Sequence, residues 1–125
     1  MVLSLYMARI FSLRRKSTLA LRQRKEHLLS QLKIHPDLLR ASFVERFSVC
    51  GKKNCRCRHG GDKHGPFYYL TQCLAVGTVA KFLLKTQLQQ QQAKQGVAHY
   101  RHLQEQLEEL SQINAELLRR QDPPE

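Results

Sequence analysis

Three of the four cysteines in this 125-residue chain lie within eight residues of one another, at Cys50, Cys55 and Cys57. Zinc in proteins takes four tetrahedral ligands, usually thiolate or imidazole, and ligands two to four residues apart close a chelate ring without strain. Four residues separate the first two cysteines, and a single residue separates the second from the third. The residue types and their spacing therefore predict a metal site with zinc as the cofactor.

The fourth ligand must come from His59, His64 or Cys73. A chelate ring through His59 would be tight, whereas His64 follows a flexible Gly-Gly-Asp-Lys segment and precedes the rigid Gly65-Pro66. Two other interpretations remain, namely an iron–sulfur cluster, whose usual cysteine spacing differs from this one, and thiols that bind no metal. We expect His64 to complete the site, with His59 and Cys73 as alternatives, so that the metal ligands are Cys50, Cys55, Cys57 and His64.

Positive charge is concentrated in the first half of the chain. There are 21 lysines and arginines against 10 acidic residues, a net charge of +11, and residues 1–64 carry the whole surplus. Such asymmetry favours a polyanionic partner such as nucleic acid, the alternative being a solvated basic face without a partner. We expect binding to the phosphates of DNA or RNA, with little sequence preference, through five cations in and beside the metal loop. These cations are Lys52, Lys53, Arg56, Arg58 and Lys63.

The composition argues against a membrane protein and against secretion. Hydrophobic residues make up 42% and charged residues 25%, and no run of about eighteen uncharged apolar residues occurs. The stretch Met1–Leu13 is apolar apart from Arg9, and the basic residues Arg14, Arg15 and Lys16 follow it, which is the reverse of the order in a secretory signal. We therefore expect a cytoplasmic protein in which residues 1–16 are a poorly ordered or wrongly assigned N-terminus, with Met7 as the alternative to Met1 as the first residue.

Local sequence signals divide the rest of the chain into a single domain over 17–121 and a tail over 122–125. Ser17 is a suitable N-cap for a helix over 17–34, and His35-Pro36 ends that helix before a helical turn over 36–41. A zinc loop and β-hairpin follow over 43–84, with strands predicted at 67–74 and 78–84. Thr86 and Gln89 have capping-box spacing and open a helix over 86–121.

The last helix carries a short heptad pattern, with Tyr100, Leu107 and Asn114 at a and Leu103, Leu110 and Leu117 at d. We expect a mostly helical α+β fold, in which this helix and the helix over 17–34 pack as an antiparallel pair. The pair would bracket the zinc loop and the β-hairpin. The alternative is a homodimer through the C-terminal helix, which would make the protein an interaction adaptor with a structural zinc.

An enzyme is the least favoured class. Only Glu45 and Asp62 lie near the cysteines, so a general base is hard to assign, and His27, His35, His99 and His102 are scattered along the chain. If protein ligands fill all four metal positions, no position remains for a catalytic water. We therefore expect neither catalysis nor a small-molecule substrate.

The central motif resembles a family of small, mainly bacterial proteins known as a domain of unknown function. Members are similar in having a leading helix, a Cys-x4-Cys-x-Cys…His-Gly-Pro-aromatic-Tyr-Tyr-Leu core, a β-hairpin and a closing leucine-rich helix. The resemblance covers roughly residues 17–120 and implies the same four metal positions, with His59 and Cys73 outside the pattern. The apolar segment 73–76 departs from the polar turn and basic second strand of the family. The residues that carry the resemblance are 44–47, 50–52, 55–57 and 64–70.

Overall fold

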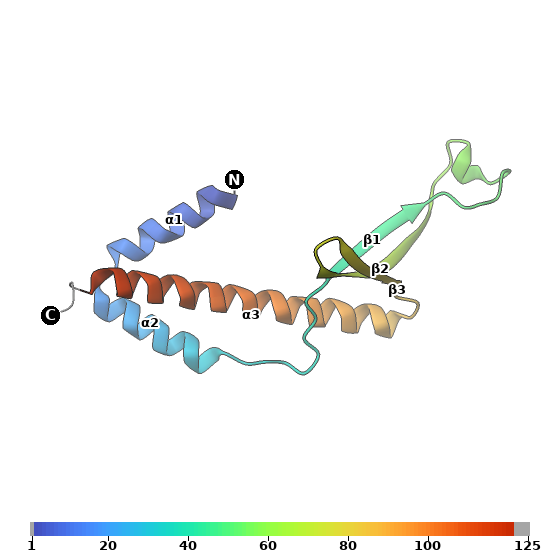
Figure 1. The fold of residues 1–125 in the computed structure, drawn as a ribbon. Coiled ribbons are helices and arrows are strands. Elements are labelled where there is room, and N and C mark those ends of the chain that lie inside the picture. Colours follow the sequence, from blue (N-terminus) through green and yellow to red (C-terminus); the bar gives the residue numbers. More distant parts are fainter. Residues whose placement is uncertain (1, 122–125) are drawn as a thin grey trace. The chain divides into compact units, whose positions relative to one another are not determined.

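The computed structural model of the chain describes residues 2–121 (Figure 1). The fold is α+β, as predicted, and about half of the chain is helical. The chain divides into two compact units. One unit joins the residues up to Ile34 with those from His102 onward, and the other is His35–Arg101. The elements are α1 (Val2–Arg15), α2 (Thr18–Gln31), β1 (Ser42–Ser48), the 3₁₀ turn η1 (Arg56–Arg58), β2 (His64–Ala75), β3 (Thr78–Leu83) and α3 (Gln87–Arg120).

The N-terminal segment, which the sequence analysis expected to be poorly ordered or wrongly assigned, contains helix α1. No glycine or proline interrupts this stretch, and the side chain of Leu13 is buried near its end. Leu13 also accepts a backbone hydrogen bond from Lys16. A buried apolar anchor thus fixes the end of a helix that the sequence analysis had set aside. The tail predicted over 122–125 lies outside the described residues.

Helix α2 begins as its sequence indicates. The hydroxyl of Ser17 accepts a hydrogen bond of 3.0 Å from the Ala20 N–H, and Ser17 has the extended backbone of an N-cap. The helix ends at Gln31, three residues before the predicted end, because the backbone of Leu32 is already extended. Within the helix, Leu21 and Leu28 are buried and face the core of their unit.

The first unit is held by an apolar cluster and by ion pairs. Leu110 and Leu117 pack against four buried residues, Leu13, Leu21, Leu28 and Ile113. Arg24 forms a two-armed ion pair with Glu109, with nitrogen–oxygen distances of 2.6 and 2.9 Å. Figure 1 shows α2 beside the C-terminal part of α3, the two helices from which these residues come.

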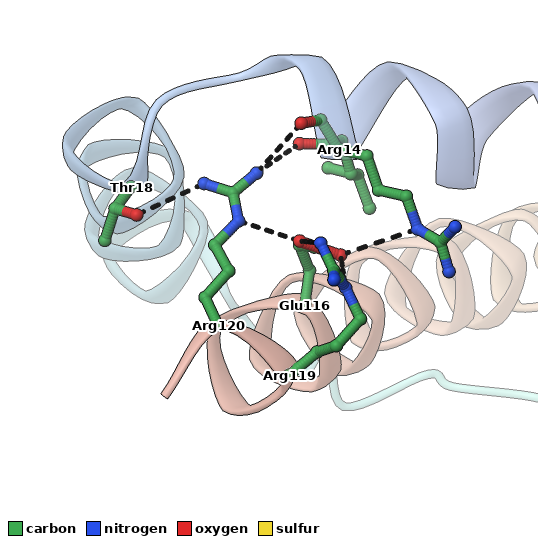
Figure 2. Close-up of polar contacts among 6 residues, drawn as sticks. Arg14, Thr18, Glu116, Arg119 and Arg120 are labelled. Carbon is green, nitrogen blue, oxygen red and sulfur yellow. Dashed lines mark hydrogen bonds and ion pairs between the residues drawn. The ribbon is translucent and has the colours of Figure 1, made fainter. Parts of the chain in front are cut away.

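A second ion cluster surrounds the buried carboxylate of Glu116 (Figure 2). Arg119 and Arg120 donate to it at 2.7–2.8 Å, and the Arg14 guanidinium lies 3.8 Å away. Arg120 also donates to the hydroxyl of Thr18 and to the carbonyl oxygens of Leu13 and Arg14. Burying an acidic side chain is costly unless it is paired, and here three arginines supply the pairing.

The predicted a positions of the heptad were wrong for the C-terminal part of α3. Leu107 is 49% exposed and Asn114 is exposed, whereas Ile113 is fully buried. The predicted d residues Leu110 and Leu117 do pack against the core. A stripe through positions 110, 113 and 117 has the same three-and-four spacing as a heptad, and it buries an isoleucine in place of an asparagine.

The second unit contains an antiparallel sheet of order β1-β2-β3. The predicted hairpin is present as β2 and β3, and Gly77 in its turn has a positive φ of 78°. The sequence analysis missed the pairing of β1 with β2, in which Val44 lies opposite Tyr69 and Ser48 opposite His64. Strand β2 also begins three residues earlier than predicted, at His64. The observed sheet is therefore three-stranded.

The core of the second unit lies between the sheet and the first part of α3. The predicted capping box opens this helix, because Thr86 accepts from the Gln89 N–H at 3.0 Å while the Gln89 side chain accepts from the Thr86 N–H. In place of the helical turn predicted over 36–41, a single turn at 36–37 leads into an irregular segment. The buried residues are Leu70, Leu84, Ala93 and Val97, with Leu39, Ala41, Phe43 and Tyr68 packed against them.

None of the helices within residues 2–121 is both long enough and apolar enough to cross a membrane.

Candidate metal centre

The loop between β1 and β2 brings the four predicted ligands together by local turns. A turn closes when the Cys55 N–H donates to the Lys52 carbonyl oxygen, and η1 begins when the Arg58 N–H donates to Cys55. The pairing of Ser48 with His64 then holds the two ends of the loop side by side. One end of the loop therefore carries Cys50, just after β1, and the other carries the first residue of β2.

The ligand atoms of Cys50, Cys55, Cys57 and His64 all lie within 4.8 Å of one another. The Cys55 Sγ is 3.1 Å from His64 Nε2, and the Cys57 Sγ is 3.6 Å from the Cys50 Sγ. Zinc–ligand bonds of about 2.0–2.3 Å in a tetrahedron place the ligand atoms about 3.5–3.8 Å apart. The four atoms thus have the spacing that a tetrahedral ion requires, with small adjustments.

Two glycines allow the loop to close around this group of ligands. A side chain on Gly61 would meet the carbonyl oxygen of Arg56 at 2.7 Å, so the close approach depends on glycine. Gly65 has a φ of +133°, and a side chain there would lie 3.0 Å from the carbonyl oxygen of Arg46. Both glycines flank the segment that delivers His64.

The thiols differ in their protonation chemistry. Hydrogen bonds from the backbone N–H of Cys57, and then from the side chains of Cys57, His64 and Cys50, lower the pKa of Cys55 to about 6. Burial raises the pKa of Cys57, the one ligand that is buried. The cluster therefore stabilises a thiolate at Cys55 near neutral pH, and a thiolate is the form of cysteine that binds metal.

The two alternatives for the fourth ligand lie outside this group. The His59 Nε2 is 3.1 Å from the backbone oxygen of Lys53, with which it forms a hydrogen bond. Cys73 is exposed and lies opposite Val79 in the β2–β3 pair. Of the three candidates, only His64 joins the cysteine cluster.

The five cations predicted to bind nucleic acid are exposed on the same loop as the ligands. The Arg58 side chain is held in place on the loop, because its Nε donates a hydrogen bond of 2.9 Å to the Cys50 carbonyl oxygen. The whole unit His35–Arg101 contains eleven lysines and arginines but only three acidic residues. The excess of positive charge therefore extends over the whole unit that contains the cysteine cluster, and it continues beyond residue 64, where the sequence analysis ended it.

The structure gathers a second group that sequence reasoning missed, made of His35, Asp37 and His99. The His99 Nδ1 is 2.7 Å from the Asp37 carboxylate, and the His35 ring stacks on His99 at 3.7 Å with an interplanar angle of 7°. The two histidines are thus not scattered, as the sequence analysis expected. The nitrogen lone pairs of the two histidines lie in the planes of their rings, and because the rings are stacked in parallel these lone pairs cannot converge on one ion. This group is therefore a poorer metal site than the cysteine cluster, and its contacts attach the segment after α2 to α3.

Comparison with known proteins adds one match. The model of a family described as a domain of unknown function (DUF6788) matches residues 18–81, which is more than half of the chain. The matched segment runs from α2 into β3 and contains all four residues of the metal group. No curated protein and no solved structure gives a significant match.

Proposed function

We propose that this chain, which belongs to the DUF6788 family, is a zinc-binding module that binds nucleic acid through the basic loop around its metal. The observation that carries the proposal is the convergence of three cysteine sulfurs and one histidine nitrogen within 4.8 Å. A set of three thiolates and one imidazole is typical of structural zinc. An iron–sulfur cluster favours thiolate ligands, and the fourth cysteine, Cys73, stands apart from the group.

The metal in this proposal has a structural role. Among residues 49–64 only one side chain is buried, and it belongs to the ligand Cys57. A loop with so little apolar burial gains its order from metal binding, whose free energy becomes folding free energy. Four protein ligands also fill a tetrahedral zinc and leave no position for a substrate or water. We therefore propose a non-catalytic protein.

Nucleic acid is the proposed partner because of charge. The loop presents five exposed cations within twelve residues, Lys52 to Lys63, and the surrounding unit has a large excess of basic over acidic residues. Cations held on a rigid loop release counterions when they contact phosphates, and this release drives binding with little dependence on sequence. The loop has no helix of the length needed to read the major groove.

The helices in this proposal form an antiparallel pair. Contacts at both ends support it, because the start of α2 at Thr18 bonds Arg120 whereas Arg24, further along, pairs with the earlier Glu109. One observation supports the competing function, which is an adaptor or a homodimer. Leu107 and Leu118 leave 49% and 67% of their surface exposed on α3. A second copy could cover such leucines.

Titration of oligonucleotides at several salt concentrations tests the proposed function. The variant with Lys52, Lys53, Arg56 and Arg58 all replaced by Ala should bind more weakly, with the slope of log K against log salt reduced by about 3 to 4. Its zinc content should remain at one per chain, since none of the four is a ligand. The matched control removes the same charge from the other unit, through Arg15, Lys16, Arg22 and Lys33 to Ala, and should keep the wild-type slope.

Two outcomes would contradict this function. Absence of binding at tens of micromolar protein, where nonspecific binders give a signal, would exclude nucleic acid as the partner. Equal slopes for the two quadruple variants would mean that the loop has no special role. A dimeric mass by light scattering, combined with either outcome, would support the adaptor.

A further inference from the structure

The three-stranded sheet uses only one of its faces for the core. Successive side chains of a strand point to opposite faces, and on β2 the residues Tyr68 and Leu70 belong to the core cluster. Phe67 and Tyr69 therefore project from the other face of the sheet. The ring of Tyr68 stacks on Phe43 on the core face, so Tyr68 and its neighbour Tyr69 lie on opposite faces of the sheet.

The register shows what surrounds these two rings on the open face. Arg46 lies opposite Phe67 in the β1–β2 pair, and Val44 lies opposite Tyr69. On the other side, Leu83 lies opposite Tyr69. Phe67 and Leu83 keep 36% and 37% of their surface exposed. The open face is thus a strip of aromatic and aliphatic side chains with solvent access.

Cations border this strip. The Lys81 Nζ lies 4.3 Å from the centre of the Tyr69 ring, so a base that stacks on this ring face must displace the ammonium, which is then free to contact a phosphate. Arg46 is exposed at the other ring, and the register places no acidic residue beside Phe67 or Tyr69. Glu45 is adjacent in sequence to Arg46, and alternation turns it to the opposite face. The charge around the rings matches an anionic partner.

We propose that this open face binds single-stranded nucleic acid by stacking bases on Phe67 and Tyr69, while Arg46 and Lys81 contact the phosphates. The proposal rests on the nucleic-acid function proposed above and assigns it a substrate class. Stacking on aromatic side chains needs an exposed base face, which single strands offer and duplexes conceal. Residues two apart on a strand are about 6.8 Å apart, twice the spacing of stacked bases, so each ring can hold its own base.

Strand β2 connects this face to the metal centre. His64, a metal ligand, begins the strand, and Phe67 follows three residues later in the same strand. The cations of the metal loop therefore precede the aromatic strip along one continuous segment of the chain. In this arrangement the loop supplies phosphate contacts and the sheet supplies base contacts, which are the two parts of a site for single strands.

The test compares a 20-nucleotide single strand, as DNA and as RNA, with a duplex of the same length. Phe67→Ala and Tyr69→Ala should each weaken single-strand binding about 5- to 150-fold and leave duplex binding unchanged. The salt slope should not change in these variants, because no cation is removed. Tyr69→Phe keeps the ring and should bind like the wild type.

The matched control is Phe82→Ala. Phe82 is also aromatic and 52% exposed, and it pairs with the core residue Leu70 in the register, which puts it on the opposite face. Its loss should leave single-strand binding unchanged. Circular dichroism and zinc content establish that each variant is folded.

The outcomes separate this proposal from the function on which it rests. If the wild type binds duplex and single strand equally, and the Phe67 and Tyr69 variants bind like the wild type, the stacking face is excluded while phosphate binding by the loop stands. If the wild type binds neither oligonucleotide, the nucleic-acid function itself fails. If Phe82→Ala weakens single-strand binding as much as Tyr69→Ala does, the assignment of the open face is wrong.

Discussion

The carbonyl oxygen of Gly96, within helix α3, accepts a hydrogen bond of 3.1 Å from the backbone N–H of Leu39. A helix can receive a neighbouring chain this closely only where it has no side chain. A Cβ at Gly96 would overlap the carbonyl oxygen of Asp37 and lie 2.9 Å from the Leu39 Cδ1. This glycine therefore serves to dock the segment after α2 on the helix.

Gly96→Ala should destabilise the unit that contains the cysteine cluster. Overpacking typically costs about 1–3 kcal/mol, and the gain of about 1 kcal/mol in helix propensity offsets only part of that cost. Urea unfolding monitored by circular dichroism measures the difference. Gln95→Ala, at an exposed neighbouring position, is the control and should change stability by less than about 0.5 kcal/mol. A Gly96→Ala protein more stable than the wild type would contradict the docking.

Ile113→Asp should unfold the other unit, whereas Leu107→Asp should be tolerated. Ile113 is fully buried beside Leu21 and Leu28, and a buried unpaired carboxylate costs several kcal/mol. Leu107 is half exposed, so its replacement should cost about 1 kcal/mol or less. Thermal unfolding distinguishes the two variants. Equal destabilisation would show that Leu107 is covered in solution, as in the homodimer.

Acid should lower the free energy of unfolding of the unit that contains Glu116. Hydrogen bonds from Arg119 and Arg120 lower the pKa of this carboxyl to about 2, from an ordinary value of 4.5. A pKa lowered by folding contributes stability above pH 4.5, and that contribution is lost as the pH falls towards 2. The hydrogen bond from Arg24 lowers the pKa of Glu109 and adds in the same direction.

Thermal unfolding measured between pH 5 and pH 2 tests this acid dependence. Glu116→Gln should lower the stability at pH 5 and flatten its decline towards pH 2. Glu105→Gln is the control, since Glu105 is exposed and forms no ion pair among the described residues. An acid dependence in Glu116→Gln as steep as that of the wild type would contradict the assignment.

Cys57→Ser should abolish metal binding, and Cys73→Ser should preserve it. Cys57 is the buried member of the cluster, whereas Cys73 is exposed and outside it. Elemental analysis should find about one zinc per chain in the wild type and in Cys73→Ser. Loss of the metal should destabilise the metal-bearing unit by several kcal/mol, because the loop has no apolar core of its own. Iron with visible absorbance, or no metal in the wild type, would overturn the zinc assignment.

The parts of this structure that the sequence predicted are those governed by short-range chemistry. The cap at Ser17 and the capping box at Thr86 act over three residues, so each marks a helix start. The cysteine cluster is also local, because all its ligands lie between Cys50 and His64. Chelate geometry and the rigid Gly65-Pro66 favoured His64 over His59 and Cys73, and His64 lies in the cysteine cluster.

The parts that the sequence did not predict depend on residues far apart in the chain. His99 and Asp37 are separated by 62 residues, and neither has a neighbour that indicates the other. The partners of Glu116 include Arg14, about a hundred positions away. The assignment of the heptad a positions was wrong for a different reason. Two stripes of residues with the same spacing exist on α3, and which of them is buried depends on the element that packs against the helix.

Helix α3 contributes to two cores that are separated along its axis. Ala93 and Val97 are buried in one core and Ile113 in the other, and no residue from 98 to 112 is buried. This central stretch is about 22 Å long. His99 pairs with Asp37 near its start, and Glu109 and Leu110 contact residues of the unit that contains the other core near its end. Cooperativity therefore passes poorly between the two ends, and the amides around Val97 and Ile113 should exchange with solvent deuterium at different opening free energies. We therefore expect one continuous helix to take part in two separately opening foldons.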